Sequence, residues 1–533
     1  MTRIIPPSLI IFAAVIAVAG TSLISCRQSS SAGKIFTRDT TITTANAYSN
    51  LFVDSFMLEN FISKEVNSDT LALQLRNFYN ARNYGFAWFD ENGPTIQAEG
   101  FWSAHKKALK KLDDISIYEV QLHTQMDTLF SDSLYTLSKD ILTVTELRMT
   151  KHFFDYVEYA YGGKVNPEVV QWYIPRRKLK PFAMLDSLLS NSGEAQLLGK
   201  SFQLLQKEVF RYKTILQNGG WKPIEQSKRK FKQGDDHKII ADIKKRLHSS
   251  DNYDKGDTTT LFTKALEDEL KKVEVSYGLE ADGIIDEDLI KQLNVSVEDR
   301  INQLLINLER MKWMPEFPSD FLLANIPEYR LHVVENNEEV MAMNIVVGKA
   351  ANRSVIFSDE LKFVVFSPYW NIPRSIVRNE IVPGMNRSRN YLSQKNMEIT
   401  GYSGGLPVVR QKPGGANALG KVKFIFPNSY NIYFHDTPSK SLFNREKRAF
   451  SHGCIRLQQP FDLAAYLLRN QPEWTKEKIE AAMNSSNEKW VTLGKNVPVF
   501  ITYFTSWVDA NGLLHFREDI YGHDKKLADH LFQ

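Results

Sequence analysis

The chain has 533 residues, of which 43% are hydrophobic and 24% charged, a composition typical of globular proteins. This length exceeds what one hydrophobic core supports, so we expect about three domains. The formal net charge is +4, and there are no long basic runs interleaved with aromatic residues, so nothing indicates nucleic-acid binding.

An apolar run near the N-terminus predicts export. Residues 9–19 are uninterrupted apolar residues that follow Arg3. The run is shorter than the roughly 20 residues that span a bilayer, but it suits a signal-peptide core. Cys26 ends the segment "LISC", which resembles the lipobox of bacterial lipoproteins. We therefore expect a lipoprotein signal peptide at 1–25, lipidation of Cys26, and a membrane-anchored lipoprotein that faces the periplasm of the cell envelope. The alternative is an ordinary secretory signal with a chance cysteine.

The cysteine count bears on the chemistry. Cys26 and Cys454 are the two cysteines of the chain. If Cys26 carries lipid, Cys454 has no partner for an intramolecular disulfide. An unpaired thiol in an exported protein is expected to be reactive.

The next segments predict a tether and a helical domain. A Ser/Thr-rich tether is expected at 26–50. Apolar residues then recur at spacings of three and four, which predicts a helical scaffold domain at 51–226. Its aromatic segment "YGFAWFDENG" favours core packing before a turn over a sugar-binding platform.

A compact helical unit is predicted at 237–298. Its segment "VEVSYGLEADGIIDEDLIKQL" resembles the three-helix peptidoglycan-binding module through Gly278, Leu279, Asp282, Gly283, Ile284, Ile285 and Leu289. Val273 and Glu274 stand where that family typically has Phe-Gln. A wall-binding role and a purely structural role both stay open, since function depends on the site and not the fold.

The hydrophobic period changes after a connecting helix at 299–320. Alternation from residue 321 predicts a mostly β domain at 321–505, with a hairpin turn at Asn336-Asn337 and a C-terminal extension at 506–533. A helical, turn-rich segment at 371–405 is out of period with the sheet, and we expect an insert there, either a lid or a structural subdomain. The predicted fold class is α+β and multidomain.

The segment "NIYFHDT" places a histidine at a predicted strand end. Alternation puts Ile432 and Phe434 on one face and Tyr433 and His435 on the other. His435 therefore lies opposite two core residues, where a catalytic base is needed.

The segment "SHGC" supplies a candidate nucleophile. A thiol is activated by a nearby imidazole, and both His435 and His452 could approach Cys454. Gly453 permits a tight turn, and backbone N–H groups there could hold an oxyanion. Together these are the parts of acyl transfer through a thioester. Two alternatives are that these residues only pack, or that the two histidines and Cys454 bind zinc, although the spacing is unusual and a fourth ligand is not evident.

The combined pattern resembles the YkuD-type L,D-transpeptidases. Their signature is a histidine, about fifteen residues, then Ser/Thr-His-Gly-Cys, a hydrophobic residue and Asn or Arg. This chain has His435, fifteen intervening residues and "SHGCIR" at 451–456. With the upstream module and the insert, the resemblance is closest to the large multidomain YcbB-like branch. It implies a helical scaffold, a peptidoglycan-binding-like module and a mostly β catalytic domain with an inserted capping subdomain.

The resemblance also implies roles for individual residues. Cys454 is the implied nucleophile, and His435 is the implied base, oriented by a backbone carbonyl near Asp436. Ser451, His452 and Gly453 would line the site, with the Gly453 and Cys454 amides as oxyanion donors. The implied substrate contacts are Arg456, whose guanidinium suits a carboxylate, and Tyr433.

The implied reaction uses peptidoglycan. Its partners are stem peptides and glycan, and it needs neither cofactor nor metal. The nucleophile attacks a tetrapeptide stem at the L-centre of the diamino acid, releases D-alanine, and passes the acyl group to the side-chain amine of another stem. Alternative acceptors are water or a protein amine. A non-catalytic lipoprotein that tethers membrane to wall is the competing function.

Overall fold

The computed structural model describes residues 34–47, 49–112, 119–131, 138–177, 179, 193–250 and 257–532. The predicted signal peptide and Cys26 lie outside these residues. The chain divides into two compact units, residues 1–95 with 128–151 and residues 96–127 with 152–533. Across the described ranges, we find no helix with the length and apolar character needed to cross a membrane.

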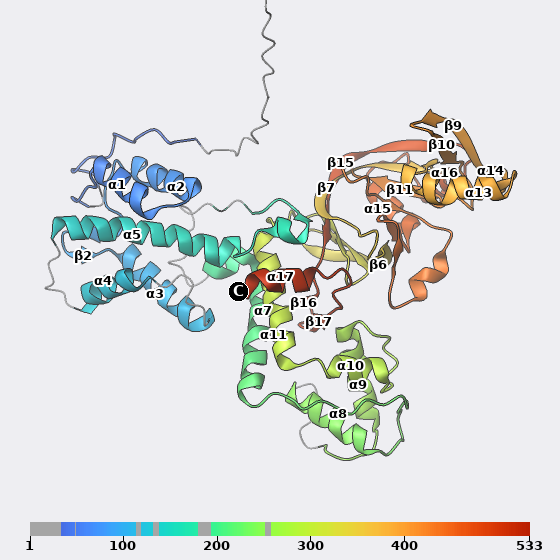
Figure 1. Cartoon of the computed structure of the whole chain (residues 1–533), viewed down its shortest axis with the longest axis horizontal. Helices are drawn as coiled ribbons and strands as arrows, with labels where there is room; N and C mark the ends of the chain where they lie inside the picture. The colour runs from blue at the N-terminus through green and yellow to red at the C-terminus, as the bar shows by residue number, and fades with distance from the viewer. Residues whose placement is uncertain are drawn as a thin grey trace, which may run out of the picture. The chain divides into compact units, whose positions relative to one another are not determined.

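The N-terminal third is helical, as predicted. Side chains of Asp54 and Ser68 accept hydrogen bonds from the first turns of two helices and cap them. Trp88 and Phe89 are fully buried, so the aromatic segment packs in a core as expected. Among the described residues, the α-helices of this third are α1 Ser55–Glu65, α2 Asp69–Asn80, α3 Ile96–Leu112, α4 Val120–Ser131, α5 Lys139–Val157 and α7 Gly193–Gln217 (Figure 1).

The module-like segment forms three helices, α8 Lys238–Ser249, α9 Lys264–Tyr277 and α10 Glu287–Leu293. Gly278 ends α9 in the left-handed region, with φ +73°. Glu274 is buried, and its Oε2 accepts a hydrogen bond from the Gly283 N–H at 2.8 Å. The residue that departs from the family pattern therefore stabilises the turn between α9 and α10.

The C-terminal domain is built on a ring of strands. Helix α11 (Val297–Trp313) precedes it. In the main sheet the strand order is β11-β12-β14-β6-β5-β4-β15-β7-β3, and β11 also pairs with β7, so eight strands close on themselves. These are β4 Phe321–Asn325, β5 Arg330–Glu335, β6 Glu338–Gly348, β7 Ile356–Phe366, β11 Val422–Ile425, β12 Phe434–His435, β14 Ile455–Leu457 and β15 Lys489–Thr502. The predicted α+β fold class is confirmed.

Two details of the sheet bear on the predictions. Asn336 and Asn337 have φ of +52° and +65°, and Glu335 pairs with Glu338 across them, so the predicted hairpin turn is confirmed. The short strand β3 (Trp172–Tyr173) comes from the helical third, yet it pairs in parallel with the start of β7. Sequence periodicity did not indicate that pairing.

The insert has its own small core. It contains β8 Trp370–Asn371, α12 Arg374–Ile376, α13 Val382–Arg387, α14 Tyr391–Gln394, β9 Met397–Ser403 and β10 Leu406–Gln411, with a π-helical turn at Val377–Ile381. The strands form a separate sheet in the order β8-β10-β9 (Figure 1). Strand β10 lies beyond the predicted end of the insert at 405. The buried residues of this core are Ile372, Ile376, Val377, Ile381 and Val409.

The C-terminal extension is folded rather than a loose tail. It forms the hairpin β16 Ser506–Val508 and β17 Leu514–Phe516, and then helix α17 His523–Leu531. On helix α11, Arg310 is fully buried and its Nη1 lies 2.6 Å from Asp524 Oδ1. This ion pair connects α17 to the helix that leads into the mostly β domain.

Candidate active site

The face of strand β12 agrees with the predicted phase. Ile432 and Phe434 are 5% and 0% exposed and belong to the main core. Tyr433 and His435 alternate with them and lie on the opposite face. The prediction from alternation therefore holds.

The pairing of β12 with β14 brings the candidate residues together. The strands are parallel, with His435 opposite Arg456, and the Ile455 N–H donates to the Tyr433 carbonyl at 3.3 Å. Paired residues of neighbouring strands share a face, and so do residues two apart along one strand. His435 and Arg456 therefore share a face of the two strands. Tyr433 and Cys454, each immediately before its strand, continue the alternation onto that face.

The His435 ring is held by one nitrogen. Its Nδ1 and the carbonyl oxygen of Asp436 are 2.5 Å apart, so Nδ1 carries the proton and donates it. The lone pair of Nε2 is then available to a substrate or thiol proton. Burial lowers the pKa of His435 to about 3, and the positive charge of Arg456 adds to the effect. The imidazole is therefore neutral at neutral pH, as a general base must be.

Asp436 keeps the turn after His435 in place. Its carboxylate accepts a hydrogen bond from the Lys421 N–H at 2.8 Å and pairs with Lys440 Nζ at 2.6 Å. Gly420 makes room for it, because a Cβ there would lie 2.3 Å from Asp436 Oδ2, and its φ is +63°. Asp436 thus contacts the His435 ring through its main-chain carbonyl, while its carboxylate anchors the turn.

Cys454 is the thiol on the face that also carries His435. Its Sγ–H donates to the Asn431 carbonyl at 3.7 Å. Burial raises the thiol pKa, although a hydrogen bond from Tyr433 and the charge of Arg456 act in the opposite direction. A raised thiol pKa beside a lowered imidazole pKa favours a neutral pair over a preformed thiolate and imidazolium. Proton removal must then accompany attack on the substrate.

Tyr433 and Arg456 border the thiol. Burial and the neighbouring thiolate form of Cys454 raise the pKa of Tyr433, so its phenol stays protonated and can donate. Burial lowers the pKa of Arg456. Within the described ranges no carboxylate forms an ion pair with Arg456, and its Nε is buried without a hydrogen-bond partner. The guanidinium therefore carries a positive charge that an anionic substrate group could neutralise.

The "SHGC" turn uses most of its polar groups internally. Ser451 is 2% exposed; its Oγ accepts from the Gly453 N–H at 3.1 Å and donates to the Cys454 carbonyl at 2.5 Å. Gly453 has φ +122°, a conformation that favours glycine. In the part of the chain that the structure describes, the Cys454 N–H has no hydrogen-bond partner. It is the better candidate of the two predicted oxyanion donors, because the Gly453 amide is already engaged.

His452 lies in a different environment. Its side chain is 46% exposed, and its Nε2 is 3.5 Å from Glu380 Oε1 in the insert. For the zinc alternative, the described residues contain no group of three His, Cys, Asp or Glu side chains arranged to hold a metal.

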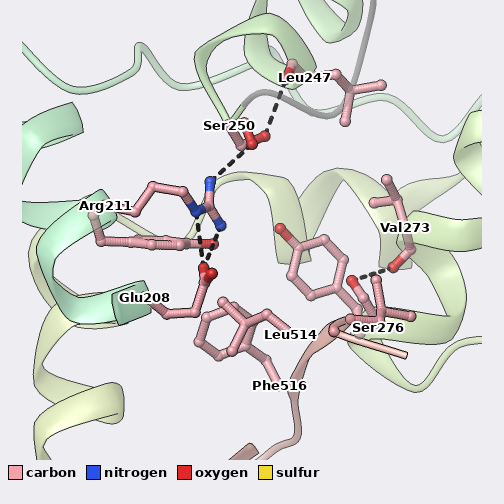
Figure 2. Close-up of a pocket in the computed structure, with 12 residues that line it drawn as sticks. Glu208, Arg211, Leu247, Ser250, Val273, Ser276, Leu514 and Phe516 are labelled. Carbon is pink, nitrogen blue, oxygen red and sulfur yellow. Dashed lines mark hydrogen bonds and ion pairs between the residues drawn. The ribbon is translucent and has the colours of Figure 1, made fainter. Parts of the chain in front are cut away.

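One cavity lies away from Cys454 and His435. A cavity of about 250 Å³ is bounded by α7, α8, α9 and β17 (Figure 2). Its charged residues already pair with each other, with Arg211 Nη2 lying 2.7 Å from Glu208 Oε2. The lining residues include neither a cysteine nor a histidine. This cavity therefore offers neither of the groups that the face with Cys454 and His435 provides.

Sequence reasoning missed several supports of the site. The Asn431 carbonyl contacts the Cys454 thiol, and Gly420 and Lys440 lie against Asp436; none of the three belongs to the recognised signature. Gly420 alone carried a signal, as a glycine close before a strand, but nothing in the sequence tied it to Asp436.

Comparisons with known proteins bear on this geometry. Residues 319–499 match a family model described as the L,D-transpeptidase catalytic domain, and residues 73–216 match one described as a scaffold domain. A curated protein of Haemophilus influenzae, whose name provisionally assigns it to the L,D-transpeptidases, is 31% identical over 248 residues, or 44% of this chain and 50% of the relative. This chain thus spans about half the length of that relative.

Solved structures give further similarities. An L,D-transpeptidase from Mycobacterium smegmatis is 14% identical, with a TM-score of 0.20 over 34% of this chain and 58% of that chain. An L,D-transpeptidase from Xylanimonas cellulosilytica is 12% identical, with a TM-score of 0.17 over 52% of this chain and 99% of that chain.

Proposed function

We propose that this chain, which carries an L,D-transpeptidase catalytic domain at residues 319–499, cross-links the peptide stems of peptidoglycan. The observation that carries the proposal is the shared face of β12 and β14. It holds a thiol, a neutral imidazole and an unpaired guanidinium on two adjacent strands.

The first half of the reaction acylates Cys454. The Sγ attacks the carbonyl on the L-centre of the diamino acid in a tetrapeptide stem, while Nε2 of His435 takes the thiol proton. The tetrahedral oxyanion receives the Cys454 N–H. As the bond to D-alanine breaks, His435 returns the proton to the leaving amine, and a thioester remains.

In the second half, the acyl group passes from Cys454 to an acceptor amine. The side-chain amine of a second stem attacks the thioester, and His435 removes its proton. The Cys454 thiolate leaves and is reprotonated, and a new amide bond joins the two stems. Arg456 binds a stem carboxylate in both halves, and the Tyr433 phenol donates to the sulfur when it is anionic.

Two alternatives differ in the acceptor or in the need for chemistry. Water as acceptor would give a carboxypeptidase, and a protein amine would attach a protein to the wall. A non-catalytic tether would need neither the oriented imidazole nor the free amide beside the thiol, and these features favour an enzyme.

The proposal also includes the location of the protein in the cell. A lipid on Cys26 would hold the chain at a membrane in the cell envelope, facing the periplasm. The module at 237–298 would add contacts to glycan. Labelling with a radioactive fatty acid, lost in Cys26→Ala, would support the anchor.

The direct test uses the full-length protein and a disaccharide tetrapeptide from peptidoglycan. We expect released D-alanine, an intact-protein mass that corresponds to a thioester at Cys454, and a cross-linked dimer. In Cys454→Ala, release should fall to background, with a melting temperature within about 2 °C of wild type because only a small side chain changes. Unchanged release in this variant would overturn the mechanism. A free tripeptide as sole product would assign water as the acceptor.

A further inference from the structure

A buried serine outside the recognised signature contacts the nucleophile turn. Ser354 is 1% exposed and follows a short loop after β6. Its hydroxyl donates to the Gly453 carbonyl at 2.7 Å and accepts from the Gly348 N–H at 3.0 Å. Both polar functions of this hydroxyl are therefore used, and one of them holds the residue before the nucleophile.

The Gly453 carbonyl belongs to the same peptide unit as the Cys454 N–H. In a trans peptide the carbonyl and the N–H lie in one plane and point in opposite directions. A hydrogen bond to the carbonyl therefore fixes the direction of the N–H. It also polarises the unit, which strengthens the N–H as a donor.

This peptide needs such a restraint. Gly453 has φ +122°, and a Cβ there would come no closer than 3.6 Å to its neighbours, so packing alone does not fix its rotation. Glycine also has the widest choice of backbone conformations. The Ser451 hydroxyl holds the Gly453 N–H and the Cys454 carbonyl, which belong to the two flanking peptides, whereas the Ser354 hydroxyl holds the Gly453 carbonyl of this peptide itself.

Tyr521 in turn holds Ser354. Its buried phenol donates to the Gly348 carbonyl and accepts from the Ser354 N–H at 3.2 Å. Gly348 sits in a tight turn, because a Cβ there would lie 2.1 Å from the Asn352 carbonyl oxygen. Tyr521 lies beyond residues 319–499, in the C-terminal extension.

We propose that Ser354 is a positioning residue that presets the Cys454 N–H as oxyanion donor, and that Tyr521 fixes Ser354 for this task. The proposal rests on the proposed function, since it concerns the transition state of that reaction. It gives the C-terminal extension a part in catalysis without any contact to substrate.

Ser354→Ala is the main test. An oxyanion donor acts in the transition state and not in substrate binding, so kcat for D-alanine release should fall about 10- to 100-fold, with KM within about twofold. Ser354→Thr keeps a hydroxyl and should recover most of the rate. Alkylation of Cys454 by iodoacetamide forms no oxyanion and should proceed at the wild-type rate.

Ser367→Ala is the matched control. Ser367 is 3% exposed and its hydroxyl also donates to a main-chain carbonyl, that of Ala482, at 2.9 Å. We expect a similar change in melting temperature and an unchanged kcat. If both variants keep wild-type kcat, or if Ser354→Ala slows alkylation as much as D-alanine release, the inference is wrong. Wild-type protein that releases no D-alanine would instead refute the proposed function.

Tyr521→Phe tests whether Tyr521 fixes Ser354. It removes one donor and one acceptor from the Ser354 loop, so kcat should fall about 3- to 10-fold, less than in Ser354→Ala, because the serine hydroxyl remains. Tyr79→Phe removes a buried phenol that lies 2.7 Å from Thr150 Oγ1 in the other unit, and it should leave kcat unchanged. If Tyr521→Phe and Tyr79→Phe have the same kcat, Tyr521 has no part in positioning Ser354.

Discussion

The regions around His435 and His452 carry the same side chain in opposite environments. His435 is 4% exposed at the end of β12, with one ring nitrogen held by the main chain. The His452 side chain is 46% exposed and contacts a carboxylate of the insert. Both histidines belong to the recognised signature, yet only one is built into the sheet.

The difference shows which surroundings suit an imidazole to act as a base. Burial and the nearby guanidinium of Arg456 keep the His435 ring neutral, and the Asp436 carbonyl selects the tautomer. His452 is closer to Cys454 in the sequence, but this proximity neither keeps a ring neutral nor selects its tautomer. Substituting each histidine, or varying the charge of His435 with pH, tests this contrast.

The largest effect is expected for His435→Asn. Asparagine can keep a donor near the Asp436 carbonyl but has no basic nitrogen at the position of Nε2. Because a positioned general base contributes about 10²- to 10⁴-fold, kcat/KM for D-alanine release should fall by that factor. Steady-state kinetics at pH 7.5 would measure it. A loss below fivefold would mean that another group removes the thiol proton.

A second effect is the pH dependence of stability. The folded pKa of His435, about 3, lies below the unfolded value of about 6.5. Its contribution to the free energy of unfolding is therefore complete above pH 6.5 and is lost as pH falls towards 3. The stability advantage of wild type over His435→Asn should shrink by about 2 kcal/mol between pH 7.5 and 5. Urea unfolding at both pH values would measure this difference, and a constant difference would contradict the lowered pKa.

The smallest effect is expected for His452→Asn, the same substitution in the exposed region. Its contact with Glu380 is half exposed, and such pairs are worth at most about 1 kcal/mol. We expect kcat/KM within about threefold of wild type, measured under the same conditions as for His435→Asn. A loss as large as in His435→Asn would assign the base to His452 and remove the contrast between the two regions.

The sequence predicted the site better than its surroundings. Alternation placed Tyr433 and His435 on the face away from the core, because successive side chains of a strand point to opposite faces. The hairpin at Asn336-Asn337 was predictable because both residues tolerate positive φ. The signature identified Cys454 through residue types and spacing that the chemistry needs.

Contacts between distant segments were not predictable. The parallel pairing of β12 with β14 joins strands about twenty residues apart, and alternation does not report which strands are neighbours. Tyr521 reaches Ser354 across more than 160 residues through a hydrogen bond that leaves no periodic pattern. The domain boundaries, the roles of the site residues and the lipid anchor stay predictions.

The pairing of β3 with β7 affects when the sheet can fold during synthesis. Trp172 pairs with Ile356, so a segment synthesised early waits for about 180 further residues before its partner strand exists. Closing so long a loop carries an entropic cost that local contacts do not, and long-range pairing slows folding. A fragment that begins at the catalytic domain would start with the edge of β7 uncovered. Strand β3 is therefore a folding partner of β7 within the same compact unit, and a recombinant form of the β domain should keep it.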